Sequence, residues 1–131
     1  MSSPDEMDSM QSVLIVDDEA NMLREMQESL EQAGYQVDTT SRAKDALARL
    51  KQNRPDLLIV DAMMPEMDGF ELMALVRRDP ALSDLPIIIL SVRGANSDML
   101  LGYKPGSETY LLKPLAREML LACVRDRMGW V

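Results

Sequence analysis

The sequence predicts an α/β domain with a doubly wound, five-stranded parallel sheet and helices on both faces. Short apolar runs alternate in strict order with segments of helical periodicity, which is typical of consecutive βα units. A length of 131 residues suits one domain, and 47 % apolar residue types are enough for a core without disulfides. Residues 1–11 are polar and are expected to form a flexible segment before a domain spanning 12–131.

The five strands differ in polarity, and this difference predicts their order. Runs 12–16, 57–60 and 87–90 are apolar on both faces and are expected in the centre of the sheet. Runs 35–40 and 109–112 are more polar and are expected outside them. Right-handed crossovers then favour the strand order 2-1-3-4-5.

Five helices are expected between and after these strands. In the first of them, Met22, Met26 and Leu30 recur at helical spacing, and Gly34 is a typical helix stop. Ser41 can cap the second helix, which Pro55 ends. The helices are expected at 19–33, 41–53, around 70–76, about 96–103 and 115–128.

Composition excludes several kinds of chemistry. The chain carries 22 acidic and 14 basic side chains, and a net charge of −8 argues against direct nucleic-acid binding. It contains no histidine, which excludes histidine-ligated metals, Ser-His-Asp and Cys-His nucleophiles, and a phosphohistidine donor. The single cysteine, Cys123, excludes an internal disulfide. No signal peptide or membrane-spanning run is recognisable, so a cytoplasmic protein is expected.

Polar side chains follow four of the predicted strands at their carboxyl ends. Asp17 and Asp18 follow the first strand, Asp61 the third, Ser91 the fourth and Lys113 the fifth. Ligands bind at this edge of a doubly wound sheet, next to the reversal in winding. Three converging carboxylates would repel one another, and a hard divalent ion such as Mg²⁺ removes that conflict.

Each of these residues also has a simpler interpretation. Asp17 and Asp18 can complement the dipole of the following helix, and Asp61 can be a turn residue at a strand end. Lys113 can be an ordinary surface lysine, and Ser91 can cap a loop. Tyr110, which lies three residues before Lys113, is either a half-buried strand aromatic or an aromatic that swings between solvent and the space beside Ser91.

Five motifs in this order resemble the receiver domains of two-component response regulators, a flavodoxin-like family. The resemblance covers about 13–128, nearly the whole chain. The motifs are VLIVDDE at 13–19, PDLLIVD at 55–61, MPEMDG at 64–69, LPIIILS at 85–91 and GSETYLLKP at 106–114.

The resemblance implies a phosphorylation-activated switch in a bacterial phosphorelay. Asp61 is then the phosphoacceptor, which takes a phosphoryl group from a sensor histidine kinase or a histidine phosphotransfer protein. Asp17 and Asp18 form the acidic pair, and Asp18 and Asp61 bind Mg²⁺ directly. The backbone carbonyl of Met63 completes the protein ligands of the ion.

The resemblance also assigns the remaining residues of the edge. Lys113 and Ser91 form the phosphoryl-binding pair, and the Lys113–Pro114 bond is cis. Ser91 and Tyr110 form a two-state element that alters the partner-binding surface on phosphorylation. Such a domain catalyses only its own phosphorylation and dephosphorylation and is not otherwise an enzyme.

The sequence departs from the common receiver pattern at a few positions. Val92 stands where a small residue is usual, Met63 is bulky and apolar, and Arg93 follows Val92. We expect these three residues to shield the site from water and to prolong the phosphorylated state. Pro105 and the pair Glu108-Thr109 also differ from the usual sequence before the fifth strand.

Two other functions and several partners stay open on the sequence. A magnesium phosphohydrolase with an aspartyl nucleophile usually has a second acid at the position of Met63, and a pseudo-receiver usually lacks part of the site. The downstream target is either a separate protein or an output domain missing from this sequence. A dimer through the fourth helix, fifth strand and fifth helix is a further expectation.

Overall fold

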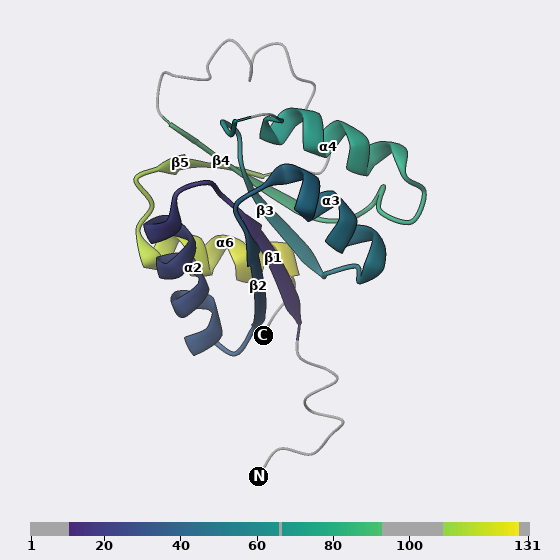
Figure 1. Cartoon of the computed structure of the whole chain (residues 1–131). Coiled ribbons are helices and arrows are strands. Elements are labelled where there is room, and N and C mark those ends of the chain that lie inside the picture. Colours follow the sequence, from purple (N-terminus) through teal and green to yellow (C-terminus); the bar gives the residue numbers. More distant parts are fainter. Residues whose placement is uncertain (1–10, 66, 93–108, 129–131) are drawn as a thin grey trace.

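The computed structural model describes residues 11–65, 67–92 and 109–128, and these form one parallel sheet covered by helices (Figure 1). The strands are β1 (Ser12–Val16), β2 (Gln36–Thr40), β3 (Leu57–Asp61), β4 (Ile87–Val92) and β5 (Thr109–Lys113). The helices are α2 (Ala20–Gln32), α3 (Ala43–Gln52), α4 (Gly69–Arg78) and α6 (Arg117–Met128). The strand order is β2-β1-β3-β4-β5, which confirms the predicted topology.

Four of the five predicted helices are present in this part of the chain, and their bounds differ by a few residues from those expected. The helix expected at about 96–103 lies outside the described residues, as do Arg93, Pro105 and Glu108. Residues 1–10 of the expected flexible segment lie outside them too. Gln11 belongs to the ordered fold, because its side-chain amide donates to the Met128 carbonyl at 3.1 Å.

Successive side chains along each strand point to opposite faces of the sheet, which divides the core into two layers. Odd-numbered residues of β1 and β3, such as Val13 and Ile59, pack under α2 and α6. Even-numbered residues, such as Leu14 and Leu58, pack under α3 and α4. Both faces of the central strands are therefore buried, which is why their sequences are continuous apolar runs.

Local signals set two of the helix ends, whereas the predicted Ser41 cap is wrong: the N-cap of α3 is Arg42, and its side chain makes no capping hydrogen bond. Gly34 adopts φ 102° directly after α2, and its N–H donates to the Glu31 carbonyl. The carboxylate of Asp68 accepts a hydrogen bond of 2.8 Å from the Glu71 N–H and so caps the start of α4. No helix among the described residues is long and apolar enough to cross a bilayer.

Candidate phosphoacceptor site

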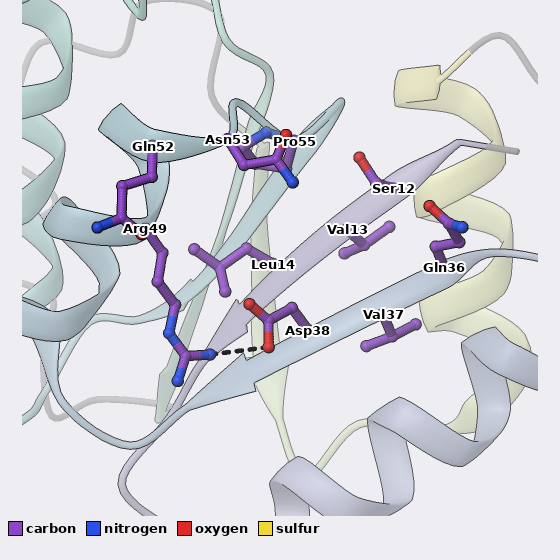
Figure 2. A pocket seen from close by; sticks show the side chains of 10 residues that line it. All are labelled: Ser12, Val13, Leu14, Gln36, Val37, Asp38, Arg49, Gln52, Asn53 and Pro55. Carbon is purple, nitrogen blue, oxygen red and sulfur yellow. Dashed lines mark hydrogen bonds and ion pairs between the residues drawn. The ribbon is translucent and has the colours of Figure 1, made fainter. Parts of the chain in front are cut away.

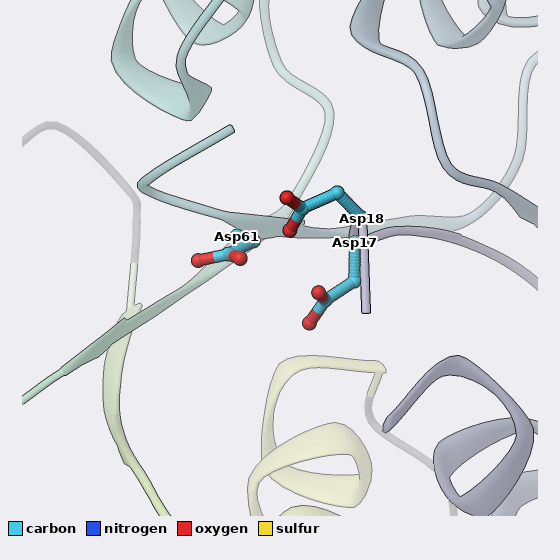
Figure 3. Close-up of side chains that lie close together, drawn as sticks. All are labelled: Asp17, Asp18 and Asp61. Atoms are coloured by element: carbon cyan, nitrogen blue, oxygen red, sulfur yellow. The ribbon is translucent and has the colours of Figure 1, made fainter. Parts of the chain in front are cut away.

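The parallel sheet brings the predicted site residues together at one edge. Asp61 is the last residue of β3, and Asp17 follows β1 directly, so the pairing of β1 with β3 places their carboxylates side by side. Figure 3 shows Asp17, Asp18 and Asp61 gathered at this edge. One carboxylate oxygen from each of the three lies within 4.8 Å of the others.

Lys113 bridges two of these carboxylates. Its ammonium nitrogen Nζ lies 2.9 Å from Asp17 Oδ2 and 3.2 Å from Asp61 Oδ2. Asp17 is fully buried and Asp61 is 5 % exposed, so the positive charge of Lys113 compensates two carboxylates that have little contact with water. The contact with Asp17 is the shorter of the two.

Backbone N–H groups orient the two buried carboxylates. The Glu19 N–H donates to Asp17 Oδ1 at 2.9 Å, and the Met63 N–H donates to Asp61 Oδ1 at 3.2 Å. Each carboxylate thus has one oxygen held by the backbone and the other by Lys113. The Lys113–Pro114 peptide bond, which follows the bridging lysine, is cis.

The charges at this edge do not balance. Three carboxylates face one ammonium, which leaves two negative charges among the residues of the cluster. Asp18 is exposed, so its carboxylate is open to solvent beside the two buried ones. Hard oxygen ligands with excess negative charge and one solvent-facing member fit a Mg²⁺ ion.

The pKa values reflect this crowding. Burial raises the pKa of Asp61, and the negative charge of Asp17 raises it further, while the Met63 N–H and Lys113 act in the opposite direction. Burial alone would lower the pKa of Lys113, but its hydrogen bonds and charge interactions with Asp17 and Asp61 outweigh burial and raise it. Lys113 therefore stays protonated, and an ionised Asp61 is costly to the fold.

A first prediction follows from the raised pKa of Asp61. Stability from a carboxyl whose pKa is raised by folding is fully present below its unfolded-state pKa and is lost as the pH rises through its folded-state pKa. Replacing the carboxyl by an amide removes that loss. In EDTA at pH 7, we expect Asp61→Asn to raise the free energy of unfolding by about 1 kcal/mol.

Urea denaturation of wild type and Asp61→Asn at several pH values checks this expectation. The difference between the two proteins is expected to shrink as the pH falls into the range where Asp61 is protonated. A variant less stable than wild type at pH 7 would contradict the idea that the ionised carboxylate strains the site.

Ser91 and Tyr110 belong to the opposite row of strand side chains from Asp61 and Lys113. Ser91 lies two residues after Ile89 on β4, so the two side chains point to the same face of the sheet. Ile89 packs in the layer under α3 and α4. Tyr110 is partly buried against the same layer. Ser91 is 1 % exposed, and its hydroxyl has no hydrogen-bond partner within the described part of the chain.

An unpartnered buried hydroxyl is uncommon, because desolvation without a hydrogen bond is unfavourable. At the end of β4, next to the end of β3, the Ser91 hydroxyl is available to an anionic group held on Asp61. This supports the expected role of Ser91 at the site.

Gly69 is a site residue that the sequence interpretation did not assign. Its N–H donates to the Ala62 carbonyl at 3.0 Å, and a Cβ at this position would overlap the Asp61 carbonyl oxygen. The first turn of α4 therefore packs directly on the backbone of Asp61 and Ala62. The sequence signal for it is the pair Asp68-Gly69, a helix cap followed by the smallest residue.

Met63 has a half-exposed side chain beside the cluster. Its exposed fraction is 50 %, while its N–H is fixed on Asp61. Val92 ends β4, but its side chain lies outside the described residues. The shielding expected of Val92 and Arg93 therefore stays a prediction.

The chain is similar in sequence to proteins of one known family. The family model described as response regulator receiver domain matches residues 13–125. Response regulator Rre1 of Synechocystis is 36 % identical over 119 residues, which cover 90 % of this chain and 52 % of that protein. The phosphate regulon transcriptional regulatory protein PhoB of Rhizobium meliloti is 37 % identical over 113 residues, which cover 86 % of this chain and 50 % of that protein.

Solved structures agree in fold. The Vibrio cholerae chemotaxis protein CheY4 superposes with a TM-score of 0.83 at 32 % identity, over 91 % of this chain and 99 % of that one. A response regulator from Chloroflexus aurantiacus, described as putative in its structure report, gives a TM-score of 0.82 at 34 % identity, over 92 % and 99 %. The chain spans about half the length of the curated relatives it matches.

Proposed function

Because the chain belongs to the response regulator receiver family of two-component signalling, we propose that Asp61 accepts a phosphoryl group and that this modification switches a partner-binding surface. Receiver domains are regulatory signalling domains. The observation that carries the assignment to Asp61 is the position of its carboxylate beside Asp17 and Asp18, 3.2 Å from the Lys113 ammonium. The Ser91 hydroxyl, which has no hydrogen-bond partner among the described residues, lies at the end of the neighbouring strand β4.

The proposed reaction is an in-line displacement. An oxygen of the Asp61 carboxylate attacks the phosphorus of a phosphohistidine on a sensor kinase or phosphotransfer protein. The P–N bond breaks as the P–O bond forms, and the released imidazole takes up a proton from solvent. Phosphoryl transfer depends on positioning and charge stabilisation, which the groups around Asp61 provide.

Different residues would contact different oxygens of the phosphoryl group. Lys113 keeps its charge at neutral pH, since its pKa is raised, and can pair with a phosphoryl oxygen as Asp61 becomes esterified. The Ser91 hydroxyl can donate to a second oxygen. Asp18, Asp61 and the Met63 carbonyl would hold Mg²⁺, with Asp17 beside them; the ion would supply positive charge for the transferring group.

We further propose that Ser91 and Tyr110 transmit the change. When the Ser91 hydroxyl moves to an oxygen of the aspartyl phosphate, space opens on the face that Tyr110 shares. A local charge change then biases a two-state side-chain element. The partner, whether a separate protein or an output domain, would contact β5 and α6, where Leu112 and Met119 are exposed. A dimer through this surface and the segment at 96–103 stays a prediction.

The direct test is phosphorylation by a small-molecule donor. With acetyl phosphate and Mg²⁺, intact-mass spectrometry is expected to show the gain of one phosphoryl group in wild type and none in Asp61→Asn. The control is Asp45→Asn, which removes an exposed carboxylate of α3 and is expected to keep the mass gain. No gain in wild type, or an undiminished gain in Asp61→Asn, would contradict the proposal, whereas repeated turnover of a phosphate ester would indicate a phosphohydrolase.

The lifetime of the phosphorylated state gives another prediction. The Met63 side chain is half exposed, and its N–H is bound to the Asp61 carboxylate, so replacing it with the polar Asn should admit and orient water near the phosphoryl group. We expect Met63→Asn to shorten the half-life of the phosphoprotein several-fold.

The matched control is Met119→Asn, an equally drastic change at a methionine of α6 that is 57 % exposed. The decay of the phosphorylated mass after removal of acetyl phosphate measures both variants. An unchanged half-life in Met63→Asn would show that this side chain does not shield the site.

A further inference from the structure

The open edge of the sheet at β2 has its own side-chain contacts. Among the described strands, β2 pairs with β1 alone, so one side of its backbone faces away from the sheet. The Gln36 N–H and the Thr40 carbonyl both hydrogen-bond toward β1. Because backbone groups alternate along a strand, the N–H and C=O groups of Val37 and Thr39 face the open edge.

Both outward groups of Thr39 are occupied by side chains. Its N–H donates to Asp38 Oδ1 at 3.0 Å, and its carbonyl accepts from Arg49 Nη1 at 2.7 Å. The same Arg49 nitrogen lies 2.7 Å from Asp38 Oδ1 and closes the arrangement. Figure 2 shows Arg49 reaching from α3 to Asp38 on β2. We call this pair with its two backbone contacts the Asp38–Arg49 clasp.

Stability alone does not account for this geometry. The side chains of Arg49 and Asp38 are 41 % and 64 % exposed, and ion pairs this exposed contribute little to folding. Their position is the distinctive feature. Both line an open groove of about 620 Å³ that runs beside Gln36 and Val37, and together they occupy the backbone groups of the edge strand next to it.

We propose that the Asp38–Arg49 clasp closes the β2 edge against strand pairing with a second copy of this chain. An uncovered edge strand is a template for another strand. Antiparallel pairing of two β2 strands about Val37 is self-complementary, because each Val37 exchanges both of its hydrogen bonds with its counterpart. In that register Asp38 lies opposite Gln36 of the second copy, so no like charges oppose the contact.

The clasp blocks the continuation of such a pairing. The next pair of hydrogen bonds along the edge would use the N–H and C=O of Thr39, and both are already taken. Only the groups of Val37 remain, and a single pair of bonds does not hold two chains together. In this register Thr39 lies opposite Tyr35 of the second copy, whose N–H is bonded to its own Leu30 carbonyl. Opening the clasp would therefore release the Thr39 N–H to donate to the Tyr35 carbonyl, which adds one bond on each side of the Val37 pair.

The chain offers a closely matched control. Arg54 lies 3.0 Å from Asp84 Oδ1 and also donates to a backbone carbonyl, that of Ala81, at 3.2 Å. Its side chain is 39 % exposed, but its carbonyl partner belongs to a loop and not to a strand edge. The double variants Asp38→Ala/Arg49→Ala and Asp84→Ala/Arg54→Ala therefore remove the same charges and similar bonds.

Sedimentation of the full chain, with folding checked by circular dichroism, tests the proposal. Asp38→Ala/Arg49→Ala is expected to double the molecular mass seen for wild type, and Asp84→Ala/Arg54→Ala is expected to leave it unchanged. An unchanged mass for the first variant, or an equal increase in both, would overturn the proposal.

Two measurements keep the test specific to the edge. Adding Val37→Pro removes an outward N–H that the sheet does not use, so it should abolish the dimer of Asp38→Ala/Arg49→Ala; persistence of the dimer would overturn the proposed pairing. In wild type, the Thr39 amide is expected to exchange its hydrogen about tenfold more slowly than the Val37 amide. Equal exchange would show that the clasp does not occupy the edge.

Discussion

Replacing Lys113 with methionine is expected to lower the free energy of unfolding by about 3 kcal/mol when divalent cations are absent. The substitution keeps most of the side-chain length but removes the ammonium that lies 2.9 Å from Asp17 and 3.2 Å from Asp61. Both carboxylates are buried, so their charges would lose their shared counterion in a poorly solvated place.

The same variant should show how the site responds to a divalent cation. Without Lys113 the carboxylate cluster is more negative and should bind Mg²⁺ more tightly than in wild type. A ligand that binds only the folded state raises the free energy of unfolding with the logarithm of the ratio of ligand concentration to Kd. Saturating Mg²⁺ is therefore expected to stabilise Lys113→Met more than wild type. The rate of phosphorylation by acetyl phosphate should still fall about a hundredfold, since a charge that faces the phosphoryl group is missing.

Urea denaturation with EDTA and with Mg²⁺ measures both effects. Lys44→Met, an exposed lysine of α3, is the control and is expected to stay within about 0.5 kcal/mol of wild type. If Lys113→Met unfolds at the same urea concentration as Lys44→Met, the bridge between the two carboxylates has no structural role.

Gly69→Ala is expected to destabilise the fold by about 3 kcal/mol and to impair phosphorylation with it. The new methyl group would overlap the Asp61 carbonyl oxygen and lie 3.0 Å from the Ala62 Cα. Both obstacles are backbone, which cannot rotate away as a side chain would. Either α4 moves outward or the end of β3 shifts, and the second response displaces the Asp61 carboxylate.

Gly34→Ala separates this effect from a general cost of losing glycine. No heavy atom lies within 4 Å of a Cβ at Gly34, and the expected penalty of about 1 kcal/mol comes from its φ of 102°. Thermal unfolding and the rate of mass gain with acetyl phosphate are compared in the two variants. Normal phosphorylation and stability in Gly69→Ala would show that α4 does not fix the acceptor strand.

The topology and the convergence of the site could be predicted because they follow from general geometry. Apolar runs locate the central strands, and parallel strands place Asp17, Asp61 and Lys113 at one edge whatever the details of packing. The polarity of the run at 35–40 correctly placed β2 outside.

Features that depend on exact distances between helices and strands were not predictable. The contact of Gly69 with Asp61 depends on how closely α4 approaches β3, and the sequence shows only a helix cap there. The preference of Lys113 for Asp17 depends on a difference of a few tenths of an ångström. The Asp38–Arg49 clasp joins a strand to the last turn of the next helix, and no sequence motif indicates it.

The alternation of strand side chains between the two faces of the sheet has a consequence for how the partner of such a domain can change. Asp61 and Lys113 continue the rows of side chains that lie under α2 and α6, whereas Ser91 and Tyr110 continue those under α3 and α4. The proposed phosphoryl ligands therefore come from both rows, and Ser91 would connect the reaction to the face that carries Tyr110. Substitutions on that face away from Ser91 can alter partner recognition without changing the residues that would hold the phosphoryl group.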